Sequence, residues 1–389
     1  MSVMGFSLGT AITYCTVLIV FASTGHVAGC YKAIVSFGDS VTDTGNLIHN
    51  SKLLSNGFVK SSVPPYGETF FRYPTGRYSD GRLIIDFIAQ SMGLPFVQPY
   101  FGGGSNGDRS FVEGVNFAVA GATAMDISFF MERGIINSAT NVSLGNELDW
   151  FKQMLSSFCQ TPSRCKEYLQ SSVVLMGEIG GNDYNYAFLQ GHPKEEVLSF
   201  VPKVITVIAS TINELIKYGV QTLIVPGNLP IGCSASYLSY FMTSNASEYD
   251  PRTGCINWLN DFAENHNELL QEELDRLREL HPHATIIYAD YYNAAMRLYR
   301  SPSNYGFNNT LEACCGGGGP YNSNAHVYCG SQLSTVCDSP SSYINWDGSH
   351  LTEAAYRWIA DGLLKGPFTS PQINGACILS RPKPKILDS

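Results

Sequence analysis

The sequence predicts an α/β protein in three layers, a doubly wound, mostly parallel sheet of five strands with helices on both faces. Short apolar runs rich in β-branched residues recur at wide spacing, at residues 33–37, 114–119, 172–176, 222–225 and 284–289. Segments with helical periodicity separate these runs, and this alternation is typical of parallel sheets. No internal repeat or long linker is visible, so residues 30–378 are expected to form one domain.

The segments between the strands are predicted to be helices at residues 82–92, 144–158, 194–218 and 258–280. The last shows the pattern most clearly, because leucines recur at helical spacing and charged residues fill the other positions. Two long loops remain, at residues 46–79 and 301–345. The first is rich in proline, glycine and aromatic residues, and the second holds four cysteines. Loops of this length on an α/β scaffold commonly shape a functional site.

Composition limits the class of partner. The chain of 389 residues is 44% hydrophobic and carries a formal net charge of −9. Its basic block, residues 381–385, lies within residues 379–389, which we expect to form a disordered tail. The composition therefore argues against a nucleic-acid partner, and it gives no indication of the oligomeric state.

Residues 1–29 have the features of a cleaved signal peptide. They contain no charged side chain, and an apolar core at residues 11–22 precedes two small residues, Ala28 and Gly29. That core is shorter than the ~20 residues that a membrane-spanning helix requires. We therefore expect export without stable membrane insertion, with an uncleaved anchor as the alternative.

Ten cysteines follow residue 29, an even number that fits disulfides formed in an oxidising compartment. Cys159 with Cys165 is the most local candidate pair, and Cys233 with Cys255 is the next. No paired C-x-x-C and no histidine at ligand spacing accompanies them, so no metal or other cofactor is predicted. Sequons that a secreted protein could use for N-glycosylation begin at Asn141, Asn245 and Asn308.

Polar turns that contain glycine follow the predicted strands. The first strand runs into residues 38–40 (GDS), the second into 120–123 (AGAT) and the third into 180–183 (GGND). After the fifth strand and the cysteine-rich loop come Asp347 and His350. Because the carboxyl ends of parallel strands meet at one edge of a sheet, these turns are expected to converge. A single turn of this kind usually has no catalytic role. A serine, a histidine and a carboxylate brought together, however, indicate nucleophilic acyl transfer.

These segments match in order the blocks of a known family, and the chain resembles the plant GDSL-type esterases and lipases of the SGNH-hydrolase superfamily. The blocks are residues 37–46 (FGDSVTDTGN), 114–122 (GVNFAVAGA), 180–183 (GGND) and 346–350 (WDGSH). Val41 replaces the usual leucine of the first block, and the position stays apolar. The resemblance implies a flavodoxin-like fold and a small-molecule ester substrate.

The resemblance also assigns roles. It implies Ser40 as the nucleophile, His350 as the general base and Asp347 as the carboxylate that orients it, which agrees with the chemistry of such triads. It implies an oxyanion hole formed by the N–H groups of Ser40 and Gly121 and the side-chain amide of Asn182.

Several alternatives stay open. Gly114 is the other glycine that could serve in place of Gly121. The histidines in loops that remain rivals to His350 are His49, His192 and His326. Aromatic residues that could equally line a substrate pocket or form local core are Tyr66, Phe70, Phe71 and Tyr73. Polar residues expected to hold the turns of the blocks are Asp39, Asp43, Asn46 and Asp183.

Within the family, residues 30–34, 65–70 and 76–82 resemble the group that contains sinapine esterase and acetylajmalan esterase. This resemblance implies esters of plant specialised metabolites as substrates. We therefore expect a secreted, glycosylated, disulfide-bonded serine esterase of the apoplast or the vacuole. One alternative is an acyltransferase that passes the same acyl group to a metabolite hydroxyl. Another is a catalytically silent binding protein on an esterase scaffold.

Overall fold

The computed structural model describes residues 31–55, 58–102, 110–159 and 161–373. The predicted signal peptide, the predicted tail, Cys30 and Cys377 lie outside these residues. The described chain is built around one six-stranded sheet with the strand order β10-β5-β4-β3-β1-β2. Its strands are β1 (Ala33–Ser36), β2 (Gly114–Asn116), β3 (Ser172–Leu175), β4 (Thr222–Pro226), β5 (Thr285–Ala289) and β10 (Thr369–Ser370).

The first five strands are parallel, and their order 2-1-3-4-5 is the flavodoxin-like arrangement. The predicted fold class and these strands are therefore confirmed. The predicted number of strands was one too low, because β10 adds an antiparallel edge beside β5. With only two residues, β10 has no alternating pattern by which the sequence could reveal it.

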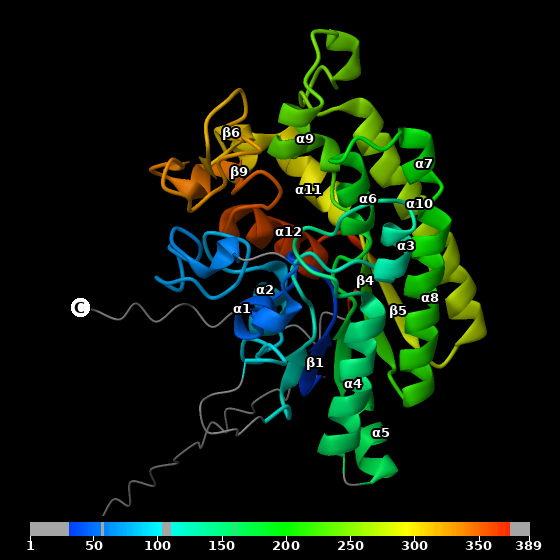
Figure 1. The fold of residues 1–389 in the computed structure, drawn as a ribbon. Coiled ribbons are helices and arrows are strands. Elements are labelled where there is room, and N and C mark those ends of the chain that lie inside the picture. Colours follow the sequence, from blue (N-terminus) through cyan, green and yellow to red (C-terminus); the bar gives the residue numbers. More distant parts are fainter. Residues whose placement is uncertain (1–30, 56–57, 103–109, 160, 374–389) are drawn as a thin grey trace, which may run out of the picture.

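Helices cover both faces of the sheet (Figure 1). One face carries α4 (Leu144–Phe158), α8 (Val201–Tyr218) and α10 (Asn257–Leu280), and the other carries α2 (Ile84–Ser91), α11 (Tyr291–Arg300) and α12 (Glu353–Lys365). Strand residues alternate between the two cores: Val174 of β3 packs in the first, and its neighbours Val173 and Leu175 pack in the second. This layering confirms the predicted three-layer architecture.

The predicted helix at 194–218 is in fact two helices, α7 (Lys194–Leu198) and α8. Pro202 lies in the first turn of α8, where its missing N–H is tolerated, and it therefore marks a helix start. By length and composition, Lys194–Tyr218 could cross a membrane, but here α8 packs against α4 and α10.

Shorter elements complete the described chain and lie mainly in the connections. The helices are α1 (Asn46–His49), α3 (Ile127–Met131), α5 (Pro162–Gln170), α6 (Gly181–Phe188) and α9 (Ala235–Tyr240). Two small ladders join β6 (Asn309–Ala313) to β9 (Tyr343–Asn345) and β7 (Cys315–Gly316) to β8 (Thr335–Val336).

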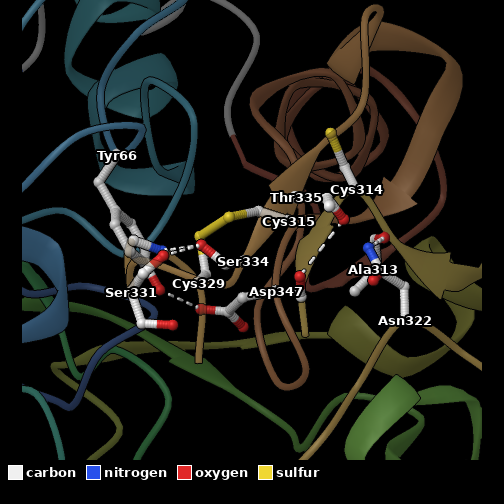
Figure 2. Close-up of a disulfide and its surroundings, with 12 residues drawn as sticks. Tyr66, Ala313, Cys314, Cys315, Asn322, Cys329, Ser331, Ser334, Thr335 and Asp347 are labelled. Carbon is white, nitrogen blue, oxygen red and sulfur yellow. Dashed lines mark hydrogen bonds between the residues drawn. A yellow bond between two sulfur atoms is a disulfide. The ribbon is translucent and has the colours of Figure 1, made fainter. Parts of the chain in front are cut away.

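Disulfides stabilise connections at both ends of the sheet: Cys159–Cys165 joins α4 to α5 at the amino end, and the other three lie in the connections at the carboxyl end. The predicted pairs Cys159–Cys165 and Cys233–Cys255 are both present. Within the second long loop, Cys314 bonds to Cys337 and Cys315 bonds to Cys329. Figure 2 shows the Cys315–Cys329 bond beside Asp347. Two disulfides therefore constrain the cysteine-rich loop, which lies next to the predicted site residue Asp347.

Candidate active site

The Ser40 turn follows β1 directly. A side chain at Gly38 would approach the carbonyl oxygen of Glu178 to 2.9 Å, and its φ of +124° also favours glycine. Asp39 holds the turn as expected, because its Oδ1 accepts the N–H of Val41 at 2.9 Å. Ser40 is only 8% exposed at this carboxyl end of the sheet.

The structure brings together the three residues predicted to act on the ester. The Ser40 Oγ and the His350 Nε2 are 2.8 Å apart. On the other side of the ring, the His350 Nδ1 is 2.9 Å from both carboxylate oxygens of Asp347. A serine hydroxyl, an imidazole and a buried carboxylate therefore form one continuous hydrogen-bonded chain.

Asp347 is held by more than its histidine. Its Oδ1 accepts the backbone N–H groups of Ser349 and His350 at 2.8 Å each, and its Oδ2 accepts the Tyr66 hydroxyl at 2.8 Å. Burial raises the pKa of Asp347, but the attraction of His350 and these hydrogen bonds outweigh burial and hold the pKa below its usual range. The carboxylate is therefore ionised at neutral pH.

The turn that carries Asp347 and His350 lies between β9 and α12. The Trp346 N–H donates to the His350 carbonyl at 2.8 Å, and the Cys315 N–H donates to the Trp346 carbonyl at 2.7 Å. The Thr352 hydroxyl caps α12 by accepting the Ala355 N–H. The Tyr78 ring packs against the His350 ring with 4.7 Å between centroids.

Gly121 and Gly114 occupy different parts of the fold. Gly114 begins β2, where a side chain would lie 2.1 Å from the Ile34 carbonyl oxygen, so close strand pairing accounts for this glycine. Gly121 follows β2 at the carboxyl end with a φ of +86°. Among the described residues, no acceptor faces the N–H of Gly121 or that of Ser40. Both N–H groups are thus free to donate to a ligand.

Asn182 joins three of the sequence blocks. It lies in the first turn of α6, and its Nδ2 donates to the Asp39 Oδ2 at 2.7 Å and to the Ala122 carbonyl at 3.1 Å. The amide is therefore fixed beside the Ser40 turn and the Gly121 turn. Both of its hydrogens have protein partners in this structure, so an oxyanion would have to share or replace one of them.

Three buried carboxyl groups, those of Asp39, Glu178 and Asp183, lie beneath the turns that carry the site residues. Burial and the neighbouring Glu178 raise the pKa of Asp39, and burial also raises that of Glu178, so this adjacent pair favours retention of a proton. Asp183 accepts the N–H groups of Ala124 and Met125 at 2.7 and 3.0 Å, as expected of a turn-supporting residue. Burial raises the pKa of Asp183 to about 7.

Asp43 and Asn46 also hold turns, as predicted. Asp43 accepts N–H groups from Gly45, Asn46, Leu47 and Ala120. Burial raises its pKa to about 6 even though these bonds lower it. The Asn46 amide donates to the carbonyl groups of Asn116, the last residue of β2, and of Ala118, which fixes the first block against the second.

None of the three rival histidines contacts Ser40 in the part of the chain that the structure describes. His192 is paired with an acid, Glu196, at 3.0 Å, which the sequence analysis had not anticipated. His49 ends α1, and His326 is exposed in the cysteine-rich loop. The geometry therefore favours His350 over all three.

The aromatic residues of the first long loop divide between different environments. Phe70 is 42% exposed and Tyr73 is 63% exposed. Phe70 and Phe71 pack together with 4.9 Å between their centroids. Tyr66 is buried and contacts Asp347 (Figure 2), a role that the sequence analysis missed because no local pattern links residues 281 positions apart.

The family model described as GDSL-like Lipase/Acylhydrolase matches residues 34–363. Two relatives described as GDSL esterase/lipases, both from Arabidopsis thaliana, are 53% identical over 94% and 95% of this chain and 90% and 93% of their own. Sinapine esterase from Brassica napus is 51% identical and covers 92% of both chains.

Among solved structures, an extracellular lipase from Streptomyces rimosus matches 86% of this chain and 96% of its own, with 12% identity and a TM-score of 0.32. The family of this chain is shown by the family model, which matches most of its length, and by its identity of 51–53% to the plant relatives. The chain belongs to the GDSL-like lipase/acylhydrolase family and is a carboxylic ester hydrolase.

Proposed function

We propose that the protein is a serine esterase in which Ser40, His350 and Asp347 form the catalytic triad. The observation that carries this proposal is the 2.8 Å contact between the Ser40 Oγ and the His350 Nε2, with the other ring nitrogen held by Asp347. A neutral imidazole at this distance can accept the serine proton, and the ionised Asp347 stabilises the cation that forms.

The proposed reaction has two halves. The Ser40 Oγ attacks the ester carbonyl carbon while its proton moves to the His350 Nε2. The tetrahedral intermediate then expels the alcohol, which takes that proton from His350 and leaves an acyl group on Ser40. In the second half His350 accepts a proton from water, the resulting hydroxide attacks the acyl carbon, and the carboxylic acid leaves as Ser40 regains its proton.

The oxyanion hole in this proposal consists of the N–H groups of Ser40 and Gly121 and the amide of Asn182. The two backbone donors have no acceptor among the described residues, and Asn182 is held between Asp39 and Ala122 beside them. Donors fixed in this way stabilise the negative charge that develops on the carbonyl oxygen.

We propose an ester of a plant specialised metabolite as the substrate. Support comes from the 51% identity to a relative named for an ester, sinapine, in addition to the resemblance of the sequence blocks. Acyl transfer to a metabolite hydroxyl is the alternative, since it uses the same acyl-enzyme. An excess of acceptor alcohol separates the two: mainly free acid supports hydrolysis, and mainly transferred ester supports the acyltransferase.

We also propose that the protein is secreted and N-glycosylated. The eight cysteines in the described part of the chain form four disulfides, which persist in oxidising compartments. The sequon asparagines lie at exposed positions, Asn141, Asn245 and Asn308. Expression in plant cells, followed by deglycosylation and mass measurement of extracellular and vacuolar fractions, tests both statements.

The experiment that tests the function is a panel of esters assayed with the wild type and with Ser40→Ala. Ser210→Ala is the control, because Ser210 is an exposed serine on α8. We expect the wild type and Ser210→Ala to hydrolyse short aryl esters and to be labelled by a serine-directed phosphonate, and Ser40→Ala to do neither. A wild type that neither turns over any ester nor takes the label would favour the binding-protein alternative.

A further inference from the structure

Tyr66 makes a contact that the triad chemistry does not itself require. Its hydroxyl donates a 2.8 Å hydrogen bond to the Asp347 Oδ2, and the residue is only 1% exposed (Figure 2). Burial, followed by the charge of Asp347, raises the pKa of Tyr66 above its usual value, so the phenol stays protonated and able to donate.

The two oxygens of Asp347 are stabilised by different parts of the chain. Oδ1 accepts two N–H groups from its own turn, those of Ser349 and His350. Oδ2 accepts the Tyr66 hydroxyl, and no other donor besides the His350 ring contacts it among the residues the structure describes. Tyr66 therefore supplies a hydrogen-bond donor to Oδ2, as the N–H groups of the local turn do to Oδ1.

Packing fixes the position of the Tyr66 ring. It contacts Tyr78 and Trp346 edge to face, with centroids 5.8 and 5.9 Å away. Tyr78 in turn packs on the ring of His350. The hydroxyl thus belongs to a rigid aromatic group that also touches the histidine.

The cysteine-rich loop closes over the residues that precede Tyr66. Gly330, next to the Cys315–Cys329 bond, lies so close that a side chain there would meet the Val63 Cγ2 at 3.0 Å and the Pro64 carbonyl at 3.1 Å. Two loops far apart in the sequence therefore meet here and hold the phenol against Asp347.

We propose that Tyr66 is a positioning residue of the esterase, whose hydroxyl holds the Asp347 carboxylate in the orientation that His350 needs during acyl transfer. The inference rests on the proposed triad. Without the hydroxyl, the buried Oδ2 would lose its neutral donor, and only its own turn and the His350 ring would then orient the carboxylate. The groups that face Asp347 and can titrate are His350, Tyr66, Tyr78 and Tyr356.

The test compares Tyr66→Phe with the wild type and with Tyr168→Phe. Tyr168 is a suitable control because it lies on α5, outside the site, and its hydroxyl donates a similar 2.9 Å hydrogen bond to the Phe111 carbonyl. We expect Tyr66→Phe to lower kcat about ten-fold with KM changed less than about two-fold. The acid limb of kcat/KM should move to higher pH, because Asp347 without this donor attracts the protonated imidazole more strongly.

A second variant keeps the packing intact. Site-specific 3-fluorotyrosine at position 66 is a stronger donor of nearly the same shape, and the acid limb should then move to lower pH. Opposite shifts in the two variants support the positioning role. The proposal is wrong if neither variant moves the acid limb of kcat/KM. It is also wrong if the acid limb stays in place and the loss of activity in Tyr66→Phe only follows its loss of thermal stability.

The proposed function is checked separately in the same experiment. Labelling of wild-type Ser40 by a serine-directed phosphonate shows that the nucleophile is active whatever Tyr66 does. A labelled and active wild type with unshifted variants overturns the role of Tyr66 alone, whereas an unlabelled, inactive wild type overturns the triad itself.

Discussion

The side-chain amide of Asn182 donates a 2.7 Å hydrogen bond to Asp39, the residue immediately before Ser40. A second bond, to the Ala122 carbonyl, ties the same amide to the turn that contains Gly121. One side chain on α6 thereby fixes the relative positions of the three groups proposed to bind the oxyanion. Its loss should harm the transition state more than the binding of the substrate.

Asn182→Ala should lower kcat by about 10²–10³-fold with a much smaller change in KM, because the lost donor acts where charge develops. Steady-state kinetics on a short aryl ester measures both constants. Asn213→Ala is the control, since Asn213 lies on α8 and contacts His281 outside the site. An unchanged kcat in Asn182→Ala would exclude this amide from the oxyanion hole.

Asp183 should make the stability of the fold depend on pH. Burial raises its pKa to about 7. A group whose pKa is raised in the folded state contributes stability that is fully present below its unfolded pKa of ~3.9 and is lost as the pH rises through the folded value. The free energy of unfolding of the wild type should therefore fall between about pH 4 and pH 7 relative to that of Asp183→Asn.

Urea denaturation at a series of pH values measures this difference. Asp126→Asn is the control, because Asp126 is exposed and backbone hydrogen bonding lowers its pKa. If Asp183→Asn and the wild type keep a constant difference in unfolding free energy across the range, Asp183 does not titrate as the structure indicates.

The buried ion pair between Arg77 and Asp86 should be important for stability. The carboxylate accepts both the Nε and the Nη2 of Arg77 at 2.8 Å, and Asp86 is 0% exposed. Asp86→Asn would leave the guanidinium buried without its partner charge, which typically costs about 3–5 kcal/mol. The exposed pair of Arg276 with Glu273 offers a control, since Glu273→Gln should have little effect.

Chemical denaturation measures both losses. The buried pair also attaches the segment containing Tyr78 to α2, so Asp86→Asn should lower kcat through the packing of Tyr78 on His350. Equal stability of Asp86→Asn and Glu273→Gln would show that the buried pair contributes no more than an exposed one.

The parallel sheet and the Ser40 turn could be predicted because their determinants are local. β1 is a short, buried run that is apolar except at Ser36, and the residues directly after it form a turn whose glycine, aspartate and serine are recognisable in the sequence. The break between α7 and α8 was missed although Pro202 signalled it, because the apolar pattern continues through the break. The prediction followed the apolar periodicity and therefore joined two helices that the proline separates.

The supporting contacts could not be predicted because they join distant segments. Tyr66 meets Asp347 only after the two long loops have packed together, and nothing near either residue encodes that meeting. The same holds for Glu178, whose neighbour Asp39 lies on another strand-end turn. Sequence blocks thus indicate which groups react, whereas tertiary packing decides which groups hold them.

The most direct test of the central claim is mass spectrometry of the enzyme quenched during turnover of an activated ester such as 4-nitrophenyl acetate. We predict a transient mass increase equal to one acetyl group, located on the peptide that contains Ser40 and absent from Ser40→Ala. Rapid turnover with the acetyl group on another residue, or with no covalent adduct on Ser40 at any quench time, would contradict the proposed mechanism.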